Sequence, residues 1–127
     1  MRYLLDTHVA LWLFEGNKKL SRIAQNIISG AENEIYVNIV SVWEVAIKVS
    51  LNKLDFGGGS EAFLSAIEAN YIDLLGVSGA YVKIAEKLPF IHRDPFDRMI
   101  ISSAIAEDLT IITIDENIQK YDVTWIW

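Results

Sequence analysis

The chain has 127 residues, of which 52% are hydrophobic and 22% are charged, and its formal charge is −6. This length fits one domain, 1–127, with its own core, and the composition excludes an intrinsically disordered chain. The absence of cysteine excludes disulfides and thiolate metal ligands, and the negative charge excludes a protein that holds nucleic acid by net charge alone.

Hydrophobic periodicity and the turn residues between segments predict strands that alternate with helices. The predicted elements, in chain order, are strand 3–5, helix 7–14, helix 20–28, strand 35–37, helix 42–51, helix 61–70 after a capping Ser60, strand 71–74, helix 80–88, helix 95–108, strand 110–114, helical turn 116–119 and strand 123–127. This alternation indicates right-handed crossovers and a largely parallel sheet with helices on both faces. The loop 52–60 contains three consecutive glycines and is either a mobile flap or an ordinary solvent loop.

The N-terminal segment and the apolar runs argue against export and membrane insertion. Asp6 interrupts the apolar opening before a signal-peptide core can form, so we expect no signal peptide. Apolar runs such as 9–14 are far shorter than the ~20 residues that a membrane span needs. We therefore expect a cytoplasmic protein.

Five acidic residues share one kind of position in the predicted fold. Each follows a strand or lies in the first turn of a helix that follows a loop: Asp6, Glu44, Asp94, Asp97 and Asp115. In open parallel sheets, binding sites form at the edge where the strands end. Acids that are far apart in the sequence are therefore expected to converge there.

Each acid also has a purely structural interpretation. Asp6, Asp94 and Asp115 can cap the helices that follow them, and Asp97 can favour the positive end of its helix. Glu44 can complete a capping box with Ser41, or pair with Lys48 four residues later. These interpretations stay open for each residue taken singly.

Gathering several acids requires a compensating charge. Two carboxylates about 5 Å apart repel by roughly 3 kcal/mol at an effective dielectric of 20. No lysine lies close in sequence to Asp6 or Asp115, so a divalent cation is the simplest neutraliser. Carboxylate and water ligands suit Mg²⁺ or Mn²⁺.

Four segments carry a family resemblance. LLDTHVALWLF, VSVWEVAIK, HRDPFDRMIISSAIAEDL and IITIDENI resemble, in order and spacing, the acidic motifs of PIN-domain nucleases, especially VapC-type toxins of toxin–antitoxin pairs. By position, Asp6, Glu44, Asp97 and Asp115 match the metal-binding acids of the family's catalytic site, and Asp94 matches an additional acid. The resemblance implies a single-domain, three-layer α/β/α sandwich around a mostly parallel sheet.

The same resemblance implies a function and partners. It indicates a Mg²⁺- or Mn²⁺-dependent endoribonuclease that hydrolyses RNA as the toxin of a toxin–antitoxin pair and is blocked by a cognate antitoxin. No protein nucleophile is required, because bound metal ions can activate water and stabilise the departing oxygen. The alternatives are a PIN-domain nuclease with a housekeeping role in RNA processing and a non-catalytic PIN-like binding module.

Several residues near the acids can support the site. Arg93 and Arg98 flank Asp94 and Asp97 and can clamp a phosphate, or pair locally. Thr7 and Thr113 can hydrogen-bond a metal-bound water. With two histidines, His8 and His92, a zinc centre is not expected, and neither is assigned as a ligand.

Two apolar stretches predict more than one buried face. Residues 9–14 and 43–47 are apolar almost all round, apart from Glu44. A homodimer interface or a groove for an antitoxin helix explains such a pattern, as does a two-sided contact within the core. We expect a homodimer.

Overall fold

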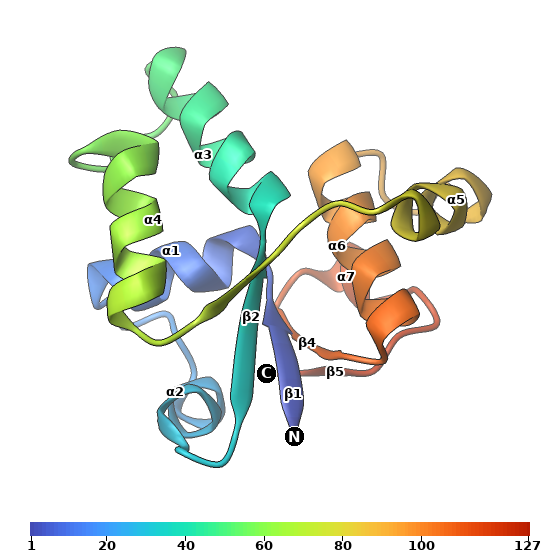
Figure 1. Cartoon of the computed structure of the whole chain (residues 1–127), viewed down its shortest axis with the longest axis horizontal. Helices are drawn as coiled ribbons and strands as arrows, with labels where there is room; N and C mark the ends of the chain where they lie inside the picture. Colours follow the sequence, from blue (N-terminus) through green and yellow to red (C-terminus); the bar gives the residue numbers. More distant parts are fainter.

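Figure 1 shows the computed structural model of the chain, which describes residues 1–127. Five strands form one sheet in the order β3-β2-β1-β4-β5, and all four neighbouring pairs are parallel. The strands are β1 (Arg2–Leu5), β2 (Glu34–Asn38), β3 (Asp73–Leu75), β4 (Thr110–Ile112) and β5 (Trp125–Ile126). The expected mostly parallel sheet is therefore parallel throughout.

Seven helices connect the strands and cover the sheet. They are α1 (Thr7–Glu15), α2 (Arg22–Ser29), α3 (Ile39–Ser50), α4 (Gly59–Ala69), α5 (Gly79–Lys87), α6 (Pro95–Glu107) and α7 (Glu116–Gln119). None of these helices is both long enough and apolar enough to cross a membrane.

The sheet separates two hydrophobic cores. In β1, Leu5 faces the core built with α1, α2, α3 and α4, whereas its neighbour Leu4 faces the core built with α6 and α7. Alternate residues of a strand point to opposite faces, so one strand of apolar residues serves both cores. Figure 1 shows α1, α2 and α4 on one side of the sheet and α5, α6 and α7 on the other. The expected three-layer α/β/α sandwich is confirmed.

The strand order defines where a site can form. From the central β1 the chain first builds outward through β2 and β3, and then crosses to build β4 and β5 on the other side. The connections after β1 and β4 therefore leave in different directions, which opens a crevice at the carboxyl ends of these two adjacent strands. Asp6 follows β1 directly, and Thr113 follows β4 directly.

Two predicted helix starts were wrong. α3 begins at Ile39, three residues earlier than expected, because Asn38 caps it by accepting a hydrogen bond from the Val40 N–H. Ser41 therefore lies inside the helix and forms no capping box with Glu44. α4 begins after Gly58, whose φ of +86° suits glycine, and Ser60 makes no cap. The glycine run thus forms the turn into α4.

Several other boundaries differ by one or two residues, among them the starts of α2 and β5. β3 begins at Asp73, because Tyr71 has a φ of +56° and ends the preceding helix turn before the chain extends. β4 ends at Ile112, two residues early, since the Thr113 and Asp115 side chains enter the crevice described below. α6 agrees with expectation: Asp94 caps it, Pro95 is its first residue and Asp108 ends it in the left-handed conformation.

Candidate metal centre

Asp6 lies at the base of the crevice, between β1 and α1. Its Oδ1 accepts a hydrogen bond from the Val9 N–H at 2.8 Å, which caps α1, and its Oδ2 accepts one from the Thr113 hydroxyl. The residue is only 3% exposed, and burial raises the pKa of the Asp6 carboxyl above its usual value. The capping interpretation and a role in a site therefore apply to the same residue, with one oxygen serving the helix.

Asp97 is a second acid whose pKa is raised strongly. It lies in the first turn of α6, and burial, followed by repulsion from Asp94, Glu44, Asp6 and Asp115, raises the pKa of Asp97 to about 8. Each of the other four acids therefore lies close enough to Asp97 to disfavour its ionisation. The tertiary structure brings all five acids together at this edge of the sheet.

Asp94 and Asp115 both cap helices at the rim of the crevice. Asp94 Oδ1 accepts hydrogen bonds from the Phe96 and Asp97 N–H groups. Asp115 Oδ1 accepts from the Asn117 and Ile118 N–H groups at the start of α7. The caps leave the Oδ2 atoms of both residues outside the helix ends.

Glu44 enters the crevice from the middle of α3. It is 2% exposed, and its Oε2 accepts a 2.6 Å hydrogen bond from Lys48 Nζ, which is the expected ion pair one turn along the helix. This bond raises the pKa of Lys48. Glu44 Oε1 is buried and has no hydrogen-bond partner at all. A buried carboxylate oxygen without a partner is costly, which indicates that a positive group belongs beside it.

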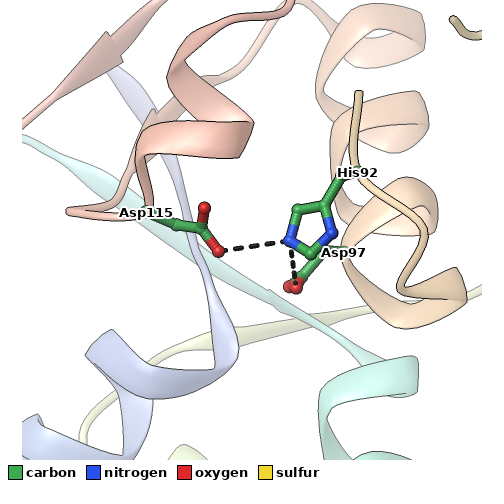
Figure 2. A group of neighbouring side chains, drawn as sticks. All are labelled: His92, Asp97 and Asp115. Atoms are coloured by element: carbon green, nitrogen blue, oxygen red, sulfur yellow. Dashed lines mark hydrogen bonds and ion pairs between the residues drawn. The ribbon is translucent and has the colours of Figure 1, made fainter. Parts of the chain in front are cut away.

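His92 is the residue of this site that the sequence analysis missed. Its Nε2 lies 2.9 Å from Asp97 Oδ2 and 3.2 Å from Asp115 Oδ2, between the two side chains, as Figure 2 shows. A signal was available in the sequence, because His92 lies two residues before the cap of α6. That position puts it at the same edge as the acids.

The donors of this crevice fit a hard divalent cation. Four carboxylates from separate elements, one of them with an unpartnered buried oxygen, supply only oxygen ligands apart from His92. Apart from Lys48, which pairs with Glu44, no basic Lys or Arg side chain forms an ion pair with these acids. Oxygen donors in excess of positive charge are what Mg²⁺ and Mn²⁺ require.

Arg98 does not take the expected phosphate-binding role. Its side chain is buried and donates hydrogen bonds to the carbonyl groups of Ala85, Leu88, Pro89 and His92 and to the Tyr121 hydroxyl. Because Arg98 follows Asp97 by one residue, its side chain points away from the helix in another direction, into the interior of the protein. Arg93 is exposed and makes no ion pair, so its role as a phosphate clamp remains a prediction.

The two threonines hold other protein groups. Thr113 donates to Asp6 Oδ2 and accepts from the Asp115 N–H, so it links β4 to the acid that follows β1. Thr7 is buried, and its hydroxyl is 2.8 Å from the Ser41 hydroxyl. The expectation that these hydroxyls hydrogen-bond a metal-bound water stays a prediction.

The chain is an α/β protein with a parallel sheet, a switch point between β1 and β4, and five acids at that edge, of which Asp6 and Glu44 are buried. The family model of the PIN domain matches residues 3–123 of the chain. The chain belongs to the PIN domain family. The expectation that the chain resembles this family is therefore confirmed.

Comparison with individual proteins gives the same picture. The chain is 27% identical over 119 residues to "Ribonuclease VapC22" of Mycobacterium tuberculosis, covering 93% of this chain and 90% of that protein. Its fold is similar to that of VapBC2 from Rickettsia felis bound to a promoter DNA fragment, with a TM-score of 0.73 and 16% identity over 100% and 99% of the two chains. It is also similar to a toxin–antitoxin complex from Klebsiella pneumoniae, with a TM-score of 0.67 and 15% identity over 98% and 96%.

Proposed function

We propose that the chain is a divalent-metal-dependent endoribonuclease that acts as the toxin of a toxin–antitoxin pair. One observation carries the proposal: carboxylates from β1, α3, α6 and β4 converge at the switch point of the sheet, and one of their oxygens, Glu44 Oε1, is buried without a partner. The similarity to a protein named a ribonuclease supports RNA as the substrate. We place the protein in the cytoplasm, where RNA is available.

Asp6, Glu44, Asp97 and Asp115 would hold the metal ion or ions, with Asp94 as a further acid at the rim. A divalent cation held there supplies Lewis-acid activation of a water and charge neutralisation at the scissile phosphate. Asp6 is fixed from two sides, by the Val9 N–H and the Thr113 hydroxyl, and is suited to a central position beside Asp97. Glu44 and Asp115 complete the pocket. Mg²⁺ and Mn²⁺ are both compatible with this donor set.

RNA has to reach an acidic centre on a chain of charge −6. Long-range attraction does not bring it there, so the bound metal charge and a few local cations have to hold the phosphates. Arg93 is exposed next to Asp94 and is the arginine of the pair that is free to contact a phosphate. Lys48 is the other nearby cation, and it is paired with Glu44.

We infer a cognate antitoxin as one protein partner, by analogy with the toxin–antitoxin complex that shares the fold. A second copy of the chain suits another surface, the apolar groove between α3 and α6. Trp43 is 63% exposed there and stacks edge-to-face on Phe96, and Ile47 and Met99 line the same groove. This surface carries no charged side chain, so two chains of equal negative charge can approach through it.

The nuclease proposal is tested on a structured RNA with purified protein. We expect cleavage with Mg²⁺ or Mn²⁺ and none with EDTA. Asp6→Asn and Asp97→Asn should each lower the activity by at least roughly 100-fold, because mutating a residue that only hydrogen-bonds a metal ligand already costs up to about 100-fold. Asp73→Asn, the same change at an exposed acid of β3, is the matched control. Full activity of both Asp6→Asn and Asp97→Asn would contradict the assignment.

The dimer is tested by light scattering on the eluting protein. The wild type should have the mass of two chains, and Trp43→Glu should have the mass of one, because a buried unpaired charge is costly at an apolar interface. A monomeric wild type would contradict the dimer.

A further inference from the structure

The position of His92 poses a question about its role. Its Nε2 lies within reach of one oxygen of Asp97 and one of Asp115, and the three atoms belong to a group compact enough to surround a cation. Imidazole nitrogen is a common metal ligand, so a direct bond from His92 to the metal is one interpretation. The hydrogen bonds on the far side of the ring decide against it.

The other ring nitrogen of His92 is already an acceptor. The Asp94 N–H donates a hydrogen bond to His92 Nδ1 at 3.3 Å. A nitrogen that accepts carries no proton, so in the neutral ring the proton is on Nε2. A protonated Nε2 has no lone pair to offer a metal, but it is a donor toward the carboxylate oxygens beside it.

The backbone around His92 is fixed as firmly as the ring. The His92 N–H donates to the Tyr121 hydroxyl at 2.8 Å, and the His92 carbonyl accepts from Arg98. Tyr121 in turn donates to the Pro89 carbonyl at 2.6 Å. The buried Arg98 and Tyr121 therefore hold the loop between α5 and α6 so that the imidazole points into the crevice, as Figure 2 shows.

The Asp97 carboxylate depends on this contact. Asp94, Asp6 and Asp115 each accept a hydrogen bond from a backbone N–H, and Glu44 accepts one from Lys48. For Asp97, the one polar contact of the side chain is His92. Without the imidazole, the Asp97 side chain would have no polar partner to fix its orientation.

We propose that His92 is a positioning residue that donates its Nε2–H to Asp115 Oδ2 and holds the same nitrogen against Asp97 Oδ2, and so orients these two acids toward the metal without binding it. The inference rests on the proposed function, since it assumes that the acids hold a divalent cation. It assigns the tautomer of His92 and gives this residue a role in orienting the acids. Groups behind metal ligands in this way typically contribute 10- to 100-fold to metal affinity.

Two variants of matched size separate a hydrogen-bond donor from simple bulk. His92→Gln keeps an N–H donor at the end of a side chain of similar reach, and His92→Met fills similar space without a donor. Tyr71→Asn, at an aromatic side chain that is 94% exposed before the start of β3, is the control for loss of a ring far from the acids. Thermal unfolding in EDTA shows whether each variant folds before its metal affinity is compared.

The affinities for Mg²⁺ and for Mn²⁺ are then measured separately by calorimetry on the full chain. We expect His92→Met to weaken both by about 10-fold or more and by the same factor, His92→Gln to stay within about threefold, and Tyr71→Asn to match the wild type. Pulsed electron paramagnetic resonance of bound Mn²⁺ should show no directly coordinated nitrogen.

Three results would overturn the inference. A coordinated-nitrogen signal that disappears in both His92 variants, with a loss of Mn²⁺ affinity larger than that of Mg²⁺, would make His92 a ligand, because Mg²⁺ prefers oxygen donors more strongly. Tighter metal binding by His92→Met would make His92 a competitor for the site. Equal affinity of His92→Met and wild type would make its contact irrelevant. If the wild type itself binds neither metal, the proposed function fails first.

Discussion

Asp97 and Arg98 are consecutive residues of α6, and they lie in two opposite electrostatic environments. Arg98 is a buried cation whose guanidinium donates to four carbonyl groups and a hydroxyl. Asp97 is a buried acid among four other acids, with His92 as its one polar contact, and its pKa is raised to about 8. The first environment is complete within the protein, and the second is not.

The difference separates structure from function. A buried charge that has all its partners stabilises the fold and needs nothing further. A buried charge that lacks them lowers stability, and a protein retains it where a ligand or a reaction supplies the missing charge. The two environments therefore predict opposite responses to mutation, and these responses can be measured in order of size.

The largest effect is expected for Arg98, whose hydrogen-bond partners all belong to the protein. Arg98→Ala leaves the carbonyl groups of the loop between α5 and α6 without donors, and orphaned buried acceptors cost about 1–3 kcal/mol each. We expect the free energy of unfolding in urea to fall by about 3–5 kcal/mol, or the protein not to fold. Arg93→Ala, at the exposed neighbour, should change it by less than about 0.5 kcal/mol. Equal small losses for both arginines would remove the contrast.

For Asp97, we expect mutation to raise the free energy of unfolding instead of lowering it. In EDTA, Asp97→Asn removes a charge that burial and repulsion disfavour, so the variant should be more stable than the wild type, by roughly 2 kcal/mol at pH 8, well under the full value of the pKa shift. Below the usual aspartate pKa the folded and unfolded chains both hold the proton. Above it the unfolded chain ionises first, so wild-type stability falls until the pH passes about 8.

The stability difference between Asp97→Asn and wild type should therefore widen from pH 4 to pH 8, by at most about 1.4 kcal/mol per pH unit. Urea unfolding of both proteins across this range measures the difference and cancels the other titrating groups. A constant difference would mean that Asp97 is ionised throughout and that the crevice already contains compensation.

Adding the metal should reduce the stability difference between Asp97→Asn and the wild type. A divalent cation at ten times its dissociation constant stabilises the folded state by about 1.4 kcal/mol. Because Asp97 has to lose its proton to bind the cation, we expect a larger increase in melting temperature at pH 8 than at pH 6 for the wild type. Asp97→Asn should show little increase at either pH. A metal effect of equal size in both proteins would place the ion elsewhere.

The smallest effect concerns the contact that links the two strands at the site. Thr113→Val keeps the shape but removes the hydroxyl that donates to Asp6 and accepts from the Asp115 N–H. We expect a loss of about 1 kcal/mol in unfolding free energy and a weaker metal effect. Thr110→Val, at the start of β4 and without a hydrogen bond from its hydroxyl, is the control. If Thr113→Val is neutral in both measurements, Asp6 is held by its backbone contact alone.

The elements and the acids could be predicted from the sequence because both depend on local patterns. Apolar periodicity indicated every strand and helix, and the position of each acid next to a strand end was enough to predict that they converge. The predictions failed where a side chain has a distant partner. Ser41 looked like half of a capping box with Glu44, but its hydroxyl meets Thr7, 34 residues away.

Arg98 and His92 show the same limit. The sequence places both beside the acids and does not say which way either side chain points. Only the packing of α5 against α6 and the position of Tyr121 send Arg98 into the protein and His92 into the crevice. Spacing along one segment cannot contain this information, because it depends on carbonyl groups and hydroxyls that other elements supply.

What the sequence determined by itself is the order of strands and helices and the five acids at one edge of the sheet, since helical and strand periodicity and the geometry of parallel crossovers depend on residues near in sequence. The tertiary structure alone decided which charges are satisfied. Burial and hydrogen bonding are properties of the assembled neighbourhood, and they make Arg98 part of the scaffold and leave Asp97 and Glu44 dependent on a positive charge from outside the chain.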